Sequence, residues 1–165
     1  MFRHLLPSAI LAIALATAHP AFAQVGIGFG GVAHDADQPV EVTADSLSID
    51  QGNGRAVFEG NVLIVQGDLR MAAGRVEVVY ADTGSGNTVQ EVLASGGVLV
   101  ARGEDAAEGA QARYDIGAAL LTMSGDVLVT QGPTAIAGDS MTVNMTTGNG
   151  TIDGRVRTVI DPEAN

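Results

Sequence analysis

Apolar and polar residues alternate in several similar segments that recur along the chain. Residues 44–51, 73–80, 109–116 and 138–145 form one such set, and their starts differ by 29, 36 and 29 residues. Within each segment every second position is mostly apolar, and the positions between are mostly polar. Successive side chains of a β-strand point to opposite faces, so this period of two predicts strands with one apolar face and one wet face.

A second set of segments lies between the first ones and repeats a glycine pattern. Residues 58–67, 94–103 and 123–132 each have Gly at the third place, Val-Leu at the fifth and sixth and Gly at the tenth, and residues 152–160 form a weaker copy. Together the two sets indicate an all-β domain of about four two-strand units, the last one truncated. Short turns make neighbouring strands antiparallel. The expected strands are residues 40–50, 55–66, 69–80, 88–102, 105–116, 119–131, 134–145 and 151–160.

The apolar face changes phase inside the long strands. Val40 and Val42 have even numbers, whereas Leu47 and Ile49 have odd ones. Each such switch falls at a pair of short residues, namely Ala44-Asp45, Ala73-Gly74 or Gly138-Asp139. A β-bulge at each pair would restore the apolar face and bend the strand. Bends in register predict a V-shaped or jellyroll sheet around one long apolar groove, which we call the trough.

The alternation assigns a set of residues to the inside of the sheet. The residues expected to line the trough are Val40, Val42, Leu47, Ile49, Phe58, Val62, Ile64, Val76, Val78, Val98, Val100, Tyr114, Met123, Val127, Val129, Met141 and Val143. In the second set of segments, Leu63, Leu99 and Leu128 make the opposite face apolar as well. Alternation does not distinguish an open trough from a closed core, so a ligand-free structural scaffold or adhesin is the alternative.

The start of the chain has the features of an export signal. A short basic start is followed by an apolar stretch of about 14 residues, too short to span a bilayer core, and by the small-x-small site Ala21-Phe22-Ala23. We expect residues 1–23 to be a signal peptide, 24–37 a flexible segment, 38–160 one β domain and 161–165 a tail. Cleavage before Gln24 would release an exported protein.

The charge of the chain limits its partners. The formal net charge is −11, and none of the eight basic residues counted as Lys or Arg is a lysine. Loss of Arg3 with the signal peptide would bring the charge to −12. Such a surface repels nucleic acid and anionic membranes, so binding to phosphate backbones is not expected. The chain has no Cys, so packing and β-ladder hydrogen bonds must hold the fold.

The residues offer little for catalysis. After the expected cleavage the chain keeps one histidine, His34, and it has no cysteine. A zinc site needs several His or Cys ligands, and a nucleophile–histidine pair would depend on His34 alone. Most carboxylates fall at turns or on the wet face, where solvation is their ordinary role. We therefore expect neither an enzyme, nor a metal site, nor a cofactor.

Three runs of residues resemble the OstA/LptA family. These are Gln38-Pro-Val-Glu-Val-Thr-Ala-Asp-Ser-Leu-Ser-Ile-Asp50, Gly60-Asn-Val-Leu-Ile-Val-Gln-Gly67 and Ala72-Ala-Gly-Arg-Val-Glu-Val-Val-Tyr80. The resemblance covers about residues 38–160 and implies a twisted antiparallel β-jellyroll. It also implies a periplasmic bridge that moves lipopolysaccharide from the inner to the outer membrane, with the acyl chains in the trough. By position, the lipid-facing residues of the family correspond to Val40, Val42, Leu47, Ile49, Phe58 and Tyr114.

The resemblance also implies partners. Family members join an inner-membrane complex partner of similar fold to the outer-membrane lipopolysaccharide translocon. The first and last strands, residues 40–50 and 151–160, have unpaired edges, which favours head-to-tail self-association. The family often carries basic residues near the groove mouth, whereas this chain has no lysine. Contact with lipid phosphates is therefore expected to be slight, or left to Arg70, Arg75, Arg102 and Arg113.

Overall fold

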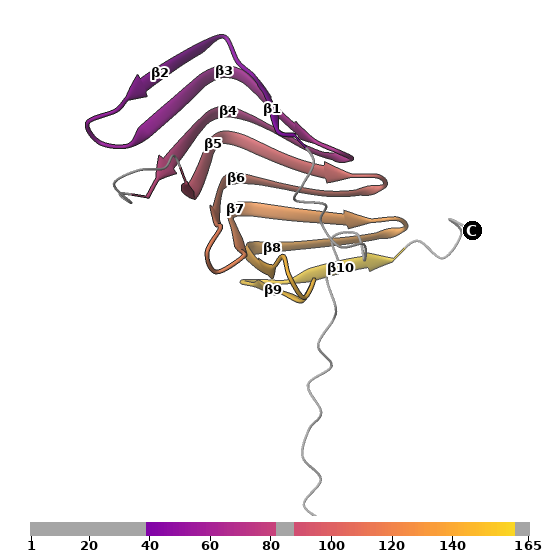
Figure 1. Ribbon diagram of the computed structural model, residues 1–165. Coiled ribbons are helices and arrows are strands. Elements are labelled where there is room, and N and C mark those ends of the chain that lie inside the picture. Colours follow the sequence, from indigo (N-terminus) through magenta and orange to yellow (C-terminus); the bar gives the residue numbers. More distant parts are fainter. Residues whose placement is uncertain (1–38, 82–87, 161–165) are drawn as a thin grey trace, which may run out of the picture.

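The computed structural model describes residues 39–81 and 88–160, and these residues form one antiparallel sheet of ten strands (Figure 1). The strands are β1 (Glu41–Thr43), β2 (Ser46–Asp50), β3 (Arg55–Gln66), β4 (Leu69–Tyr80), β5 (Val89–Arg102), β6 (Asp105–Asp115), β7 (Leu120–Gln131), β8 (Thr134–Asn144), β9 (Gly150–Asp153) and β10 (Arg157–Ile160). The expected signal peptide, the segment 24–37 and the tail lie outside the described residues.

The strands follow one another across the sheet in chain order. β1 and β2 both pair with β3, and β9 and β10 both pair with β8, while β3 to β8 are consecutive neighbours. All eight strands predicted from the sequence are present, and the first and the last are each divided into two. The first divides at Ala44-Asp45, and the last divides between Asp153 and Arg157. The prediction of an all-β antiparallel fold is confirmed.

The sheet bends in the middle of every long strand, so that the ribbons form a chevron (Figure 1). The bend divides the sheet into two arms. The first arm comprises residues 41–43, 62–73, 98–109, 127–138 and 157–160, and the second arm comprises residues 46–59, 75–80, 89–95, 111–124 and 140–153. The inner faces of the two arms enclose the trough.

Pairs of residues in left-handed conformation lie at the bend of β3, β5 and β7. In β5 both Gly96 and Gly97 have φ of 80°, a region that glycine enters without steric cost. The other two pairs, and a fourth between β9 and β10, combine Gly with another residue: Gly60-Asn61, Gly125-Asp126 and Gly154-Arg155. A Cβ added to Gly96 would lie 3.2 Å from the Cα of Gly74 in β4, so the two backbones approach closely at the bend.

The predicted phase switch is confirmed, but the extra residue lies in the opposite strand. In β4 the inner positions pass from Ala73 to Val76, both buried, as the sequence suggested. Glu59 pairs with Arg75 and Val62 pairs with Ala73, so β3 has two residues where β4 has one. The bulge is therefore in β3, and not at Ala73-Gly74. The physical reason is the left-handed backbone, which the Gly-Asn and Gly-Asp pairs of the odd strands tolerate.

Aspartates hold the bend at both ends of the sheet. The backbone N–H of Asp45 donates to the carbonyl oxygen of Gly60 over 2.9 Å, and the Nδ2 of Asn61 donates to the Asp45 carboxylate over 2.9 Å. At the other end the N–H of Asp139 donates to the carbonyl oxygen of Gly154 over 3.2 Å. Each edge therefore keeps the bend by a hydrogen bond across the point where its strand divides.

The bend can be tested with two adjacent substitutions. Gly97→Ala introduces a side chain at φ of 80° with no atom within 4 Å, so it should lower the free energy of unfolding only by the left-handed strain, about 1–2 kcal/mol. Gly96→Ala adds the close contact with Gly74 and should be the more destabilising change. Urea unfolding of both variants measures the difference. Two variants as stable as the wild type would mean that the bend does not require a left-handed backbone at these positions.

Candidate functional site

The inner side chains of each arm form rows across the sheet, because residues paired between neighbouring strands lie side by side. In the first arm one row consists of Val42, Ile64, Met71, Val100, Ala107, Val129 and Ile136. In the second arm one row consists of Leu47, Phe58, Val76, Ala94, Ala112, Met123, Met141 and Ile152. The next row toward the mouth consists of Ile49, Ala56, Val78, Val92, Tyr114, Leu121 and Val143. Both arms thus present continuous apolar inner walls.

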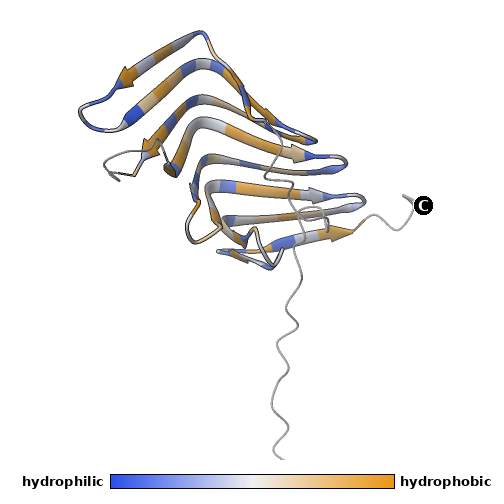
Figure 2. Ribbon diagram, viewed as in Figure 1, coloured by the Kyte–Doolittle hydropathy of each residue, from blue (hydrophilic) through white to orange (hydrophobic). Residues whose placement is uncertain are grey.

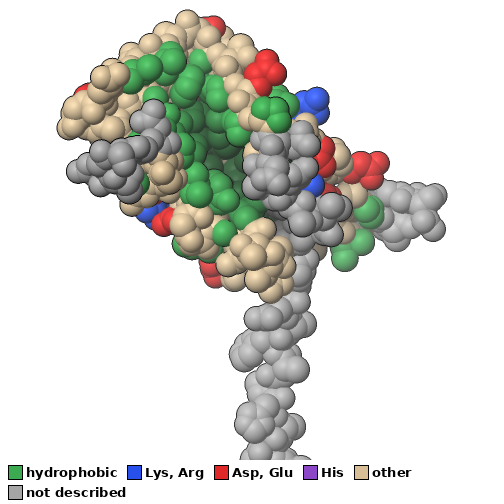
Figure 3. All heavy atoms as spheres, in the orientation of Figure 1, with side chains coloured by type: hydrophobic (Ala, Val, Ile, Leu, Met, Phe, Trp, Pro, Cys, Tyr) green, Lys and Arg blue, Asp and Glu red, His purple; other side chains and the backbone are tan. Residues whose placement is uncertain are grey.

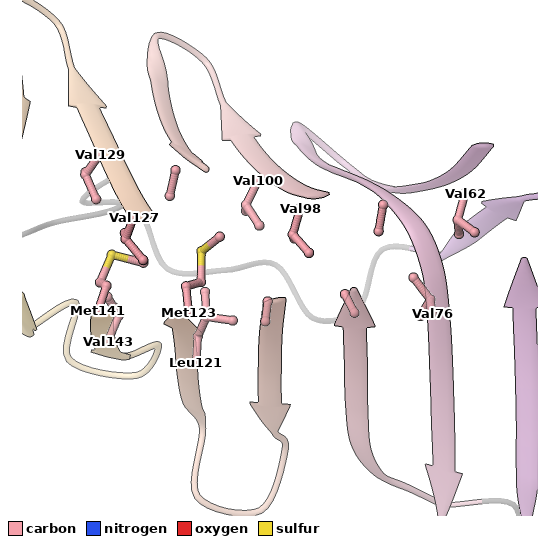
Figure 4. Close-up of a cluster of buried hydrophobic side chains, with 14 residues drawn as sticks. Val62, Val76, Val98, Val100, Leu121, Met123, Val127, Val129, Met141 and Val143 are labelled. Carbon is pink, nitrogen blue, oxygen red and sulfur yellow. The ribbon is translucent and has the colours of Figure 1, made fainter. Parts of the chain in front are cut away.

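The predicted trough residues fall on these walls. Val62, Val98 and Val127 lie on the inner face of the first arm, next to the bend, and are buried in one apolar cluster with Val76 and Val100 (Figure 4). Val40 precedes β1 and is exposed. The residues expected to line the trough do not include nine members of these rows, although each obeys the alternation of its own strand: Ala56, Met71, Val92, Ala94, Ala107, Ala112, Leu121, Ile136 and Ile152. Four of the nine are alanines, whose small side chains give a weak apolar signal.

The trough is open at one end and filled at the other. At the β1–β2 end the exposed fractions are 56% for Val40, 51% for Leu47 and 65% for Ile49. In β7 and β8 the exposed fraction of both Met123 and Met141 is 0%. Figure 3 shows apolar side chains, in green, that line a hollow, with backbone and other side chains, in tan, around it. The two interpretations of the sequence, an open trough and a closed core, therefore each describe one end of the molecule.

Residue size explains the filled end. Met123 and Met141 are cross-strand neighbours, and the unbranched methionine side chain adapts to irregular gaps. Gly138 on the opposite wall has no side chain, and the Cγ2 of Ile152 fills the space that its Cβ would take. The position equivalent to Gly138 in the first two repeat units is alanine, Ala44 and Ala73. The last units therefore combine small residues on one wall with long residues on the other, which closes the space between them.

Tyr114 brings a polar atom into the second arm's apolar wall. Its side chain is half-buried and packs against the core cluster. Burial raises the pKa of the Tyr114 hydroxyl above its ordinary value, because desolvation disfavours the phenolate. The residue is therefore neutral at physiological pH, which suits a wall that contacts apolar groups.

The arginines mostly serve the outer face of the second arm. Arg55 pairs with Glu77 over 2.7 Å, Arg75 pairs with Glu59, and Arg113 pairs with Glu91. Each of these pairs joins strands on the wet face, where an exposed ion pair contributes about 1 kcal/mol or less. Arg75 and Arg113, which were considered for contact with lipid phosphates, therefore point away from the trough.

Arg70 and Arg102 differ in position. Arg70 lies in register with Val65 and Ala101 on the outer face of the first arm. Arg102 has inner-face parity at the end of β5, its side chain is 14% exposed, and its Nε donates to the Asp68 carboxylate over 2.9 Å. Of the four arginines considered, only Arg102 faces the mouth of the trough.

The described residues contain no group of three or more His, Cys, Asp or Glu side chains arranged to hold a metal ion. All buried core side chains among residues 39–81 and 88–160 are apolar. Within the same ranges no helix is long and apolar enough to cross a membrane. What the trough can do chemically is to surround apolar groups with the apolar side chains of its two walls.

Comparison with known proteins gives consistent matches. A family model described as LptA/(LptD N-terminal domain) LPS transport protein matches residues 41–149. An uncharacterized protein of Rhizobium meliloti (strain 1021) is 30% identical over 137 residues, which is 78% of this chain and 74% of the relative. The lipopolysaccharide export system protein LptA of Escherichia coli (strain K12) is 26% identical over 132 residues, 78% of this chain and 67% of the relative.

A solved structure has the same fold. The crystal structure of LptH from Pseudomonas aeruginosa, described as the LptA-homologous periplasmic component of the lipopolysaccharide transport device, superposes with a TM-score of 0.69. The match covers 78% of this chain and 99% of that one at 19% sequence identity. The bent open sheet is therefore the β-jellyroll of that structure.

Substitutions at the two ends of the trough distinguish filled from open space. Met123→Ala should lower the free energy of unfolding by about 2–5 kcal/mol, because it leaves a cavity in packed surroundings. Ile49→Ala removes a mostly exposed side chain and should cost less than about 1 kcal/mol. Met123→Leu, which nearly conserves volume, is the control and should cost less than about 1.5 kcal/mol. If urea unfolding gave equal losses of stability for Met123→Ala and Ile49→Ala, the two ends of the trough would not differ in packing.

Proposed function

The chain belongs to the LptA/(LptD N-terminal domain) family of lipopolysaccharide transport proteins, and from this premise we propose that it carries lipopolysaccharide across the periplasm. The acyl chains lie between the two arms of the sheet, and the sugars remain in water. The observation that carries the proposal is the open end of the trough, where Val40, Leu47 and Ile49 expose apolar surface in line with the buried rows.

The energetics of acyl chains make such a carrier necessary. Moving one buried CH₂ into water costs about 0.8 kcal/mol, so a chain of about 12 carbons costs on the order of 10 kcal/mol. A lipid with several chains cannot cross an aqueous compartment alone at a useful rate. A wall of valine, isoleucine and phenylalanine replaces the membrane interior as solvent for these chains. The trough need only bind the acyl chains about as favourably as the membrane interior does, so tight binding is not required for onward movement.

Both edges of the sheet suit assembly into a longer bridge. β1 and β2 form one edge and β9 and β10 the other, and neither edge has a further strand within the described residues. Val156, Val159 and Ile160 expose apolar surface at the second edge, as Val40, Leu47 and Ile49 do at the first; the orange end of β10 in Figure 2 marks this surface. Pairing of the two edges would extend the sheet and continue the trough from copy to copy.

The same edges provide for heterologous partners. In the proposed bridge, one edge pairs with an inner-membrane partner of similar fold and the other with the outer-membrane translocon. Since strand addition uses main-chain hydrogen bonds, partners of low sequence similarity can share one geometry. The chain acts in this scheme as a binding protein and not as an enzyme.

Site-specific photo-crosslinking in cells tests the proposed ligand. A photoreactive residue in place of Ile49 or Tyr114 should form lipopolysaccharide adducts, because both positions lie on the inner wall. The matched control is Ser48, the exposed outward neighbour of Ile49, which should give none. Absence of adducts at both inner positions in folded, exported protein would sink the proposal and leave the ligand-free scaffold.

Removal of edge donors tests the proposed assembly. The double substitution Thr158→Pro and Val159→Pro removes two N–H groups of β10, one directed to each side of the strand. Sedimentation over a concentration series should show oligomers for the wild type and monomers for the variant. β10 pairs only with β8, so circular dichroism of the variant should remain that of a β protein. Oligomers of unchanged size would show that β10 is not the assembly edge.

A further inference from the structure

The mouth of the trough is polar along one arm. At the hairpin ends of the first arm, register joins one further inner row beyond Ile64, Val100 and Val129. This row consists of Gln66, Leu69, Arg102, Asp105, Gln131, Thr134 and Ile160. Five of its seven members are polar, all except Leu69 and the edge residue Ile160, and we call these five residues the polar rim.

The side chains of the polar rim are held in place by burial and by their interaction partners. Each of its residues is half-buried, although the row lies at the ends of the strands. Arg102 is held by its ion pair with Asp68, and Gln66, Asp105 and Gln131 also have interaction partners. Partly buried polar groups that are already ordered lose little further conformational entropy when they bind a ligand.

The opposite mouth has a different character. On the second arm the equivalent edge positions include Ile116, which is exposed, and Met145, which packs against the core cluster. Both side chains are apolar and continue the wall of Tyr114 and Val143 outward. Position at a strand end therefore does not by itself account for the polar rim, since two of the end positions on the other arm, Ile116 and Met145, are apolar.

When an amphiphile lies in the trough, its polar part must emerge at the mouth. The polar part has its lowest free energy where it replaces water by hydrogen bonds, and the polar rim is the wall that offers them. Glutamine amides and a threonine hydroxyl both donate and accept, as sugar hydroxyls require. Asp68 and Asp105 outnumber Arg102 locally, which disfavours an anionic group.

We propose that the polar rim is the headgroup site of the trough and binds sugar hydroxyls of a glycolipid whose acyl chains lie between the arms. This inference rests on the proposed function and gives the bound lipid an orientation. The sugar leaves over the first arm, and the second arm contacts only the chains.

Binding of two probes to purified protein tests the orientation. The variant Gln66→Ala/Gln131→Ala should bind lipopolysaccharide about tenfold more weakly than the wild type, since two hydrogen-bonding side chains are lost. Its affinity for dodecanoic acid, which has no sugar, should not change. The matched control Ile116→Ala/Met145→Ala alters the other mouth and should weaken both probes by the same factor.

The outcomes separate this inference from the proposed function. Wild-type protein that binds neither probe would end the proposed function, and the headgroup site with it. If the wild type bound both probes and Gln66→Ala/Gln131→Ala lost affinity for both by the same factor, the proposed function would stand and the headgroup site would be overturned.

A second measurement does not depend on the stability of the double variant. A photoreactive residue at Gln131 should give adducts attached to the sugar of the lipopolysaccharide, and one at Met145 should give adducts attached to an acyl chain. Mass spectrometry of the fragmented adducts distinguishes the two. Sugar adducts at Met145 and acyl adducts at Gln131 would reverse the orientation and refute the inference.

Discussion

The close approach of two backbones at the bend is the constraint on which the structure depends. Gly96 lies against Gly74 with no side chain between them, and the left-handed pair Gly96-Gly97 lets β5 contain one more residue than its partner. A flat sheet with the same alternation would have two apolar half-faces on opposite sides. The bend and the change of phase together bring both half-faces to the inside, and neither would suffice without the other.

Once the arms face each other, the size of the inner side chains decides whether the space between the arms is open or filled. Leu47 and Ile49 of the edge strand β2 stay exposed at the β1–β2 end, whereas methionines and Ile152 fill the space at the β7–β8 end. The backbones of the two arms are joined through the bend, and across the interior they meet through side chains. In the proposed transport, acyl chains that reach the filled end must displace methionine side chains, which are the ones best able to move.

The two arms also differ on the outside. The outer face of the second arm carries cross-strand ion pairs such as Arg55–Glu77, whereas the outer face of the first arm carries Leu63, Leu99 and Leu128 in one register row. The Val-Leu pair of the repeat therefore places one residue on each side of the first arm. This explains why the inner face of these segments was harder to recognise than that of the segments beginning at Ala44 and Ala73.

The sequence by itself determined the strands, their antiparallel order, the phase switches and most of the inner residues, because alternation and glycine spacing are local properties. It also indicated the family, which the matches with known proteins confirm. Three features were decided only by the tertiary structure: which strand contains the bulge, which end of the trough is filled, and where Arg102 points. Each depends on pairs of residues that are distant in sequence, such as Gly74 with Gly96 and Gly138 with Ile152. Packing between such residues follows from the register and the bend, and no periodicity within one strand encodes it.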